Sequence, residues 1–244
     1  MTSFWKIAAP VTCVAVICGA ALLWPVYQEE ALERKPAEAA RVYRARAERG
    51  EAKAQYRLGD SYAQGKGVPQ DYFEAVRWYR KAAKQGNANA EYALGYMYHQ
   101  GQGVKQDDAE AVRWFRQAAE QGNAQAQCNL GDSYAQGHGV PQDYAEAVRW
   151  YRAAAEQGYP MGQYGIGFMY YHGRGVPQDY IQAHMWTSLA ASGASGDAKQ
   201  YFVRAANHIA GEMTPEQIIE AERLAREWKP RGQPSARSEH DSQR

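Results

Sequence analysis

A repeat of 36 residues constrains the fold of this chain more than any other feature of its sequence. Tryptophans and glycines both recur at this interval through most of the 244 residues. A period of this length is typical of proteins built from stacked pairs of helices. Because one helix pair cannot bury its own apolar face, we expect an array of such pairs. The repeated tryptophans are Trp78, Trp114, Trp150 and Trp186.

Within each repeat the sequence predicts two helices joined by a glycine-rich turn. In the first repeat, apolar residues follow helical spacing from about residue 52 to 63. Gly65 and Gly67 then break the helix, since glycine adopts the positive φ that a sharp turn needs. A further glycine, Gly59, lies on the apolar face, where it would let two helix axes approach closely. Its equivalents are Gly95, Gly131 and Gly167.

An aspartate is predicted to start the second helix of each repeat. The side chain of Asp71 can accept hydrogen bonds from the free backbone amides of the first helical turn. Glu74 follows three residues later, and a glutamate there can reach back to the cap in a capping box. The same spacing predicts the helix starts of the other repeats. The corresponding aspartates are Asp107, Asp143 and Asp179.

The repeats divide the chain into five parts. Residues 1–28 form an apolar N-terminal segment, and residues 29–50 a linker with a capping helix. Residues 195–229 are predicted to form C-terminal capping helices, and residues 230–244 a disordered tail. The expected fold is therefore an all-α solenoid, capped at both ends and preceded by one membrane-spanning helix. The four repeats are residues 51–86, 87–122, 123–158 and 159–194, which together span 51–194.

The N-terminal segment contains an uncharged stretch from Ile7 to Tyr27. About 20 apolar residues in a helix cross the hydrocarbon core of a bilayer. We expect a single-pass anchor in a bacterial inner membrane, with the repeats in the periplasm. Arg34 and the basic residues after it favour the opposite orientation. The alternative is a signal peptide cleaved after Ala21, which would leave a secreted or periplasmic protein.

The repeat unit reads A-x-A-x-Y-x-L-G-x-x-Y-x-x-G-x-G-V-x-Q-D-Y-x-x-A-V-x-W-Y-x-x-A-A. This pattern resembles the Sel-1-like repeat family, a relative of the tetratricopeptide repeats. The resemblance implies a right-handed superhelical array that acts as an adaptor or scaffold, in bacteria often in the cell envelope. Cysteine-rich members bind β-lactams, but Cys128 is the only cysteine of these repeats. Penicillin binding is therefore not carried over.

Positions that differ between repeats predict where a partner would bind. On the first helix of each repeat these positions form one stripe, and stacking would join the stripes into a concave inner face. Exposed aromatic and methionine side chains there would suit a protein interface. The alternative is that these residues only pack against the neighbouring repeat. The predicted binding residues are Arg57, Asp60, Ser61, Tyr96, Met97, Asn129, Asp132, Phe168 and Met169.

The charged residues give no indication of a nucleic-acid partner. The chain has 28 Lys and Arg against 27 Asp and Glu, so its net charge is close to zero. Arg77 and Arg80, with their equivalents in later repeats, could form a basic ridge on the second helices. Because Glu74 and its equivalents interleave with them, the pattern favours a solvated charged face.

No catalytic, metal or cofactor site is predicted. The histidines His99, His138 and His172 occupy three different positions of the repeat, so we expect them to lie apart. Cys128 takes a position that holds a packing tyrosine in the other repeats, which predicts a buried, inert thiol.

The chain is therefore expected to be a non-catalytic scaffold that binds a protein partner in the cell envelope. The alternative is a protein that binds or processes a glycan or cell-wall polymer. Processing would need two carboxylates about 5–9.5 Å apart. The candidates, Asp60 and Asp132, lie two repeats apart, which corresponds to roughly 20 Å at the usual spacing of packed helices.

Overall fold

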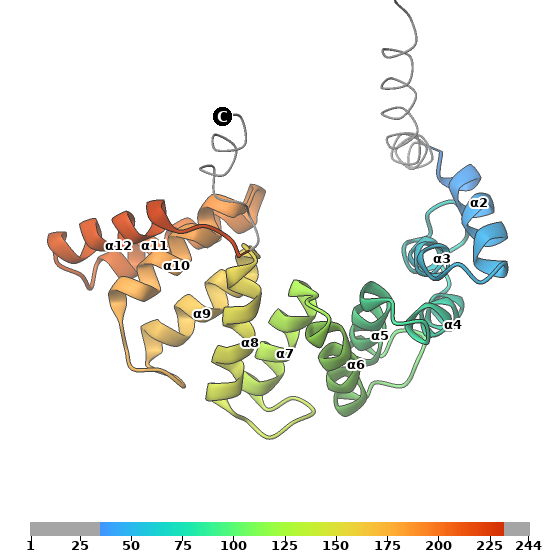
Figure 1. Cartoon of the computed structure of the whole chain (residues 1–244), viewed down its shortest axis with the longest axis horizontal. Coiled ribbons are helices and arrows are strands. Elements are labelled where there is room, and N and C mark those ends of the chain that lie inside the picture. Colours follow the sequence, from blue (N-terminus) through green and yellow to red (C-terminus); the bar gives the residue numbers. More distant parts are fainter. Residues whose placement is uncertain (1–34, 232–244) are drawn as a thin grey trace, which may run out of the picture. The chain divides into compact units, whose positions relative to one another are not determined.

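The computed structural model describes residues 35–231 (Figure 1). Within this range the chain forms eleven helices and no strand, which confirms the predicted all-α solenoid of helix pairs. It divides into two compact units, one ending at Trp78 and the other beginning at Tyr79, and each is described by itself. No helix within residues 35–231 is long and apolar enough to cross a membrane. The predicted membrane segment at residues 7–27 lies outside the described residues.

The first unit contains α2 (Pro36–Glu48), α3 (Ala52–Gln64) and the start of α4 (Tyr72–Ala83). The second unit contains the rest of α4 and all later helices. α3, α5, α7 and α9 are the first helices of the four repeats, and α4, α6, α8 and α10 are the second helices. The remaining bounds are α5 (Ala88–Gln100), α6 (Asp108–Glu120), α7 (Ala124–Gln136), α8 (Tyr144–Glu156), α9 (Pro160–His172), α10 (Tyr180–Gly193), α11 (Gly196–Ala210) and α12 (Pro215–Glu227).

The predicted aspartate caps are present, but the predicted capping box on the same helices is wrong. Asp107 Oδ1 accepts a hydrogen bond from the backbone N–H of Glu110 at 3.0 Å. The Asp107 backbone N–H, which the glutamate would have to reach, already donates to the Tyr98 carbonyl at 3.0 Å, and the Glu110 carboxylate accepts from Arg113 at 3.0 Å. The same pairing joins Glu74 to Arg77. The capping box is thus absent because the first helix of the repeat accepts the hydrogen bond from the cap residue.

The two glycines of each turn have different tasks. Gly137 ends α7 with φ of +75°, the left-handed conformation of a helix C-cap. Gly139 has φ of +73°, and a Cβ there would lie 2.2 Å from the carbonyl oxygen of Asp108. The second glycine therefore lets the turn pack directly on the first turn of α6, in the preceding repeat. Gly175 packs in the same way on Tyr144 at the start of α8.

The helix glycines permit close packing inside each pair, as predicted. A Cβ on Gly95 would lie 2.5 Å from the ring of Phe115, and one on Gly131 would lie 2.8 Å from the ring of Tyr151. These distances are far shorter than a carbon–carbon contact. α5 and α6, and likewise α7 and α8, therefore approach more closely than any larger residue would allow.

Arginine–tyrosine hydrogen bonds join successive repeats. Arg116 of α6 donates to the Tyr134 hydroxyl of α7 at 2.6 Å, and Arg152 of α8 donates to Tyr170 of α9 at 2.8 Å. Within the first unit Arg44 of α2 donates to Tyr62 of α3. α2 therefore takes the place that a second helix would take before the first repeat. Both arginines of each predicted pair have acidic or tyrosine partners, which agrees with a solvated charged face.

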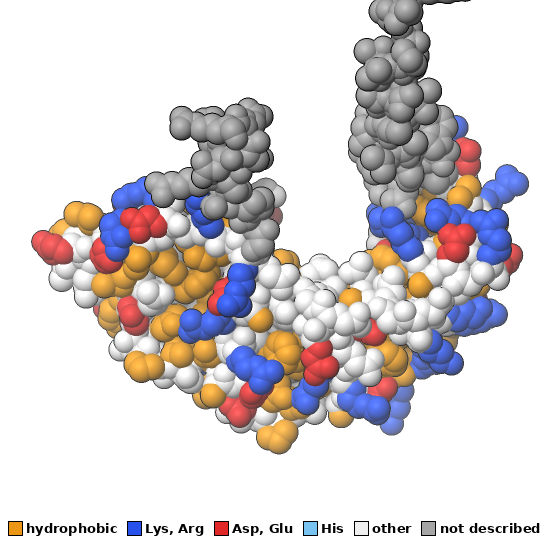
Figure 2. Space-filling model, in the orientation of Figure 1, with side chains coloured by type: hydrophobic (Ala, Val, Ile, Leu, Met, Phe, Trp, Pro, Cys, Tyr) orange, Lys and Arg blue, Asp and Glu red, His pale blue; other side chains and the backbone are white. Residues whose placement is uncertain are grey.

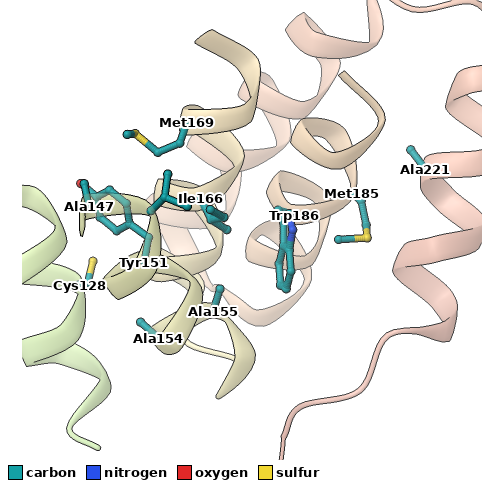
Figure 3. Packing of buried hydrophobic residues seen from close by; sticks show 11 residues of the cluster. Cys128, Ala147, Tyr151, Ala154, Ala155, Ile166, Met169, Met185, Trp186 and Ala221 are labelled. Atoms are coloured by element: carbon teal, nitrogen blue, oxygen red, sulfur yellow. The ribbon is translucent and has the colours of Figure 1, made fainter. Parts of the chain in front are cut away.

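The core of the second unit runs between successive helices and continues past the fourth repeat. Figure 3 shows Tyr151 of α8, Ile166 of α9 and Trp186 of α10 packed in one cluster. Ala221 of α12 is fully buried in the same cluster. The Trp228 ring lies edge-on to Trp186 at 5.8 Å between centroids. α11 and α12 therefore cover α10, as the predicted C-terminal capping helices would.

Candidate functional site

Three adjoining hollows lie along the first helices of the second unit. They measure about 270 Å³ between α5 and α7, about 300 Å³ between α7 and α9, and about 230 Å³ between α9 and α11. Asp132 lines the first and second hollows, and Phe168 lines the second and third. Neighbouring hollows share wall residues, so the three form a row along this side of the unit. We call this row the inner groove.

Exposed aromatic side chains line the inner groove at two of the predicted positions. Tyr96 of α5 is 41% exposed and Phe168 of α9 is 37% exposed. Met161, at the start of α9, is 47% exposed and lines the same hollow as Phe168. Asn129 lines the hollow between α5 and α7. Figure 2 shows hydrophobic side chains more densely gathered over α9–α12 than over α5–α7.

Three residues of the predicted stripe are buried. Met97 and Met169 are 5% and 1% exposed and pack in the protein interior. Ser61 is also buried, and its hydroxyl donates to the backbone carbonyl of Arg57. Each of these residues directly follows another residue of the predicted stripe, and successive residues of a helix point about 100° apart. Met169 still lines the hollow between α7 and α9, but all three side chains are buried and offer little surface to a partner.

The predicted residues of the first repeat line a separate hollow in the first unit. It measures about 390 Å³ and lies between α2 and α3, where Arg57, Asp60 and Ser61 face Tyr43 and the start of α2. Asp60 and Asp132 belong to different units, so the predicted distance between them stays a prediction.

Asp132 is the most unusual polar residue of the inner groove. It accepts a hydrogen bond from the Tyr151 hydroxyl at 2.5 Å. Burial raises the pKa of its carboxyl group, while the Tyr151 hydrogen bond and the charge of His99 act in the opposite direction. Within residues 35–231 no lysine or arginine forms an ion pair with it. The groove thus contains a half-buried carboxylate without a lysine or arginine partner from this part of the chain.

Cys128 makes room beside Asp132. The equivalent positions of the other repeats carry tyrosine, for example Tyr164 of α9. The smaller cysteine side chain forms part of the wall of the hollow between α7 and α9. The thiol is 5% exposed, and burial and the charge of Asp132 raise its pKa. The prediction of a buried thiol is confirmed, and a thiol held in its protonated form is a poor nucleophile.

Two histidines that the repeat pattern predicted to lie apart are close together. The rings of His99 and His138 lie 6.5 Å apart at the hollow between α5 and α7. His99 also lies 2.7 Å from Asp108 at the start of α6. The two histidines are 39 residues apart, one repeat plus about one helical turn, and this spacing could have revealed their proximity. No group of histidine, cysteine and acidic side chains within residues 35–231 has the arrangement of a metal site.

One arginine stands at the edge of the groove. The Arg174 guanidinium lies 5.7 Å from the centre of the Phe168 ring and 5.5 Å from that of Tyr144. Such distances are typical of a cation stacked on an aromatic face. The groove therefore offers ring faces, one acidic group and one basic group, a combination that suits binding.

Comparison with known families identifies the repeat. The model of the Sel1 repeat matches four segments, at residues 52–87, 88–123, 124–159 and 160–195. The chain belongs to the Sel1 repeat family. The Sel1 segments begin one residue after the boundaries expected from the glycines. Sel1 repeats generally mediate protein–protein interaction.

One solved Sel1 structure shares this fold, and two further solved structures are similar to the chain to a lesser degree. A Sel1 repeat protein from Oxalobacter formigenes is 35% identical, with a TM-score of 0.65, and the match covers 78% of each chain. The c5321 antigen of uropathogenic Escherichia coli is 30% identical over 79% of this chain and 56% of its own, with a TM-score of 0.46. The immunity protein Pa5087 of Pseudomonas aeruginosa resembles the chain in fold, with 21% identity, coverage of 75% and 80%, and a TM-score of 0.50. The comparison with curated proteins found no match.

Proposed function

We propose that this Sel1 protein is a non-catalytic scaffold that binds a protein partner in the inner groove. The observation that carries the proposal is the row of three adjoining hollows, in which Asp132 and Phe168 each line two. A row that extends across four helices suits an extended segment of a partner better than a small molecule. Tyr96 and Phe168 would supply the aromatic contacts that dominate many protein interfaces.

The lining of the groove supports binding rather than catalysis. Asp132 is the one carboxylate among the residues that line its three hollows. Glycoside hydrolysis by the usual route needs two carboxyl groups that flank the bond. Burial raises the pKa of the Cys128 thiol, which disfavours the thiolate that a nucleophile needs.

Site-specific photocrosslinking in cells tests this proposal. A photoreactive amino acid is introduced at Tyr96 in one variant and at Phe168 in another. The expected result is a discrete adduct with one protein, identified by mass spectrometry, from both positions. The matched control places the same amino acid at Arg113, which is exposed on α6 and lines none of the hollows.

The control decides how an adduct is interpreted. The same adduct from Arg113 would mean that the contact is not specific to the groove and would contradict the proposal. The absence of a protein adduct from all three positions would also contradict it. In that case, retention on a cell-wall glycan resin that is lost on joint alanine replacement of Tyr96 and Phe168 would support the alternative of glycan binding.

We also propose that the apolar stretch at residues 7–27 places the protein in the inner membrane, with the repeats in the periplasm. The support is the length of this stretch and its lack of charge. Fusion of alkaline phosphatase after residue 231 tests the location, because this enzyme becomes active only after export. An inactive fusion would contradict a periplasmic location, and release of the protein by a salt wash would contradict membrane anchoring.

A further inference from the structure

We propose that the part of the inner groove between α7 and α9 binds a lysine side chain of the protein partner, with its ammonium group against Asp132. We call this hollow the lysine pocket. The inference rests on the proposed function and adds the chemistry that the partner must present.

The fold itself does not require the Asp132–Tyr151 pair. In the second repeat the same two positions carry Tyr96 and Phe115, and the helices pack there just as closely. Burying a carboxylate is costly unless other groups compensate for the lost hydration. A costly group that the fold can do without is a candidate for a functional role.

The hydrogen bonding of Asp132 favours lysine over arginine. One carboxylate oxygen, Oδ1, already accepts from the Tyr151 hydroxyl. An arginine usually binds a carboxylate through both oxygens at once, whereas a lysine ammonium acts as a point charge. Asp132 has no ion pair with a lysine or arginine within residues 35–231, so a partner ammonium could pair with it directly.

The walls of the pocket suit the rest of a lysine side chain. Met161, Tyr164 and Phe168 line the hollow together with Cys128. Lysine can lie along apolar surface with its methylene groups while its ammonium reaches a polar partner. The hollow extends to Asp132 beside Cys128, which stands where the other repeats have a larger tyrosine.

Arg174 provides a test of the charge of the occupant. It lines the same hollow and stacks on Phe168, so its positive charge opposes a bound ammonium. If the occupant is a cation, removing this charge strengthens binding. If the occupant is an anion, the same change weakens it. Removing the charge of Asp132 and removing that of Arg174 therefore change the affinity in opposite directions, and both directions are reversed between a cationic and an anionic ligand.

A random peptide library displayed on phage provides the probe. Peptides are selected on the full chain purified in detergent, and enriched peptides are synthesised and titrated against it. The expected result is enrichment of peptides in which a lysine stands beside apolar or aromatic residues. Replacement of that lysine by glutamine is expected to weaken binding at least about tenfold, as for a largely buried charge pair.

Variants of the protein locate the binding. Asp132→Asn keeps an oxygen that can accept from Tyr151 and removes a buried charge, so we expect it to fold. This variant should bind the lysine-containing peptides at least about tenfold more weakly. The matched control is Asp197→Asn, an exposed position that lines none of the hollows and should leave binding unchanged. Arg174→Gln should strengthen binding about twofold, the effect of one exposed like charge.

The outcomes separate this inference from the proposed function. Selection of no peptide, selection of peptides without lysine, equal binding to Asp132→Asn, or weaker binding to Arg174→Gln would each overturn the lysine pocket. The proposed function would survive those results if Tyr96 and Phe168 still crosslink to a partner in cells. It fails independently if they do not.

Discussion

At the scale of single residues, one buried glutamate departs from the pattern of the repeat. Gln127 and Gln163 each donate a side-chain hydrogen bond to the last turn of the preceding helix, at the carbonyls of Ala119 and Ala155. In the second repeat the equivalent residue is Glu91, which is 4% exposed. An ionised carboxylate cannot donate a hydrogen bond, and burial raises the pKa of this group.

Glu91→Gln is expected to stabilise the protein at neutral pH by about 1 kcal/mol. The new amide could donate as in the other repeats and still accept from Gln121, which now donates to Glu91 at 2.6 Å. A carboxyl whose folded-state pKa is raised favours folding most below pH 4.5, and this contribution is lost as the pH rises through the folded-state pKa. The advantage of the variant should therefore grow from pH 4 to pH 7, measured by urea unfolding.

The exposed Glu120 of α6 offers the matched control. Glu120→Gln should show no comparable gain in the free energy of unfolding between the same pH values. An advantage of Glu91→Gln that shrank with rising pH would contradict the argument from burial of the charge.

Individual side chains were also the scale at which the sequence was least informative. Helical spacing predicted that Tyr96 and Phe168 differ from the packing positions, and both are exposed. It did not separate them from the buried Met97 and Met169, because variation between repeats does not show whether a side chain points outward or into the core. The environment of Asp132 depends on side chains of two helices, and a pattern along one chain segment cannot describe it.

At the scale of elements, each turn between helices depends on two glycines. The first ends the helix at a positive φ, and the second allows the turn to pack on the preceding repeat. The sequence predicted the turn because glycine and proline end helices. That Gly139 rests on α6 of the preceding repeat could not be predicted, since local spacing does not say which backbone lies opposite.

Alanine replacement of each glycine separates the two effects. Gly137→Ala meets no atom closer than ordinary contact, so only the positive φ opposes it, at a cost of about 1–2 kcal/mol. Gly139→Ala has the same φ penalty and also a clash with backbone at 2.2 Å, so we expect a cost of at least about 3 kcal/mol. Chemical denaturation of both variants measures the difference. Equal costs would mean that the turn moves away from α6 easily.

At the scale of the whole molecule, the second unit is held together by contacts between neighbours in sequence. Arg116 and Arg152 each bind a tyrosine 18 residues further on, and α12 packs on α10. In such a stack the loss of one element should affect its neighbours far more than distant helices. The repeat period predicted this architecture from the sequence, because periodicity is a property of many residues and tolerates individual exceptions.

Ala221→Glu tests this neighbour dependence. It places a charge in the fully buried contact between α12 and α10, and burial of an unpaired charge is strongly unfavourable. We expect amide hydrogen exchange at least about tenfold faster in α10 and α12, with protection retained in α5–α7.

Ile219→Glu, on the same helix at a position that is 64% exposed, is the control and should change neither region. A uniform rise in exchange through the whole second unit in Ala221→Glu would show that it unfolds as one cooperative body instead.

The arginine–tyrosine bonds have a consequence for how such a chain can change its length. Each bond spans 18 residues, half a period, so the joint runs from the second helix of one repeat to the first helix of the next. A duplication or loss of 36 residues within the first three repeats, residues 51–158, again places an arginine 18 residues before a tyrosine. Recombination between similar stretches of the gene can therefore add or remove a repeat while the arginine–tyrosine contact between neighbouring repeats is kept. Each added copy that includes Cys128 and Asp132 would supply the α7 side of another lysine pocket.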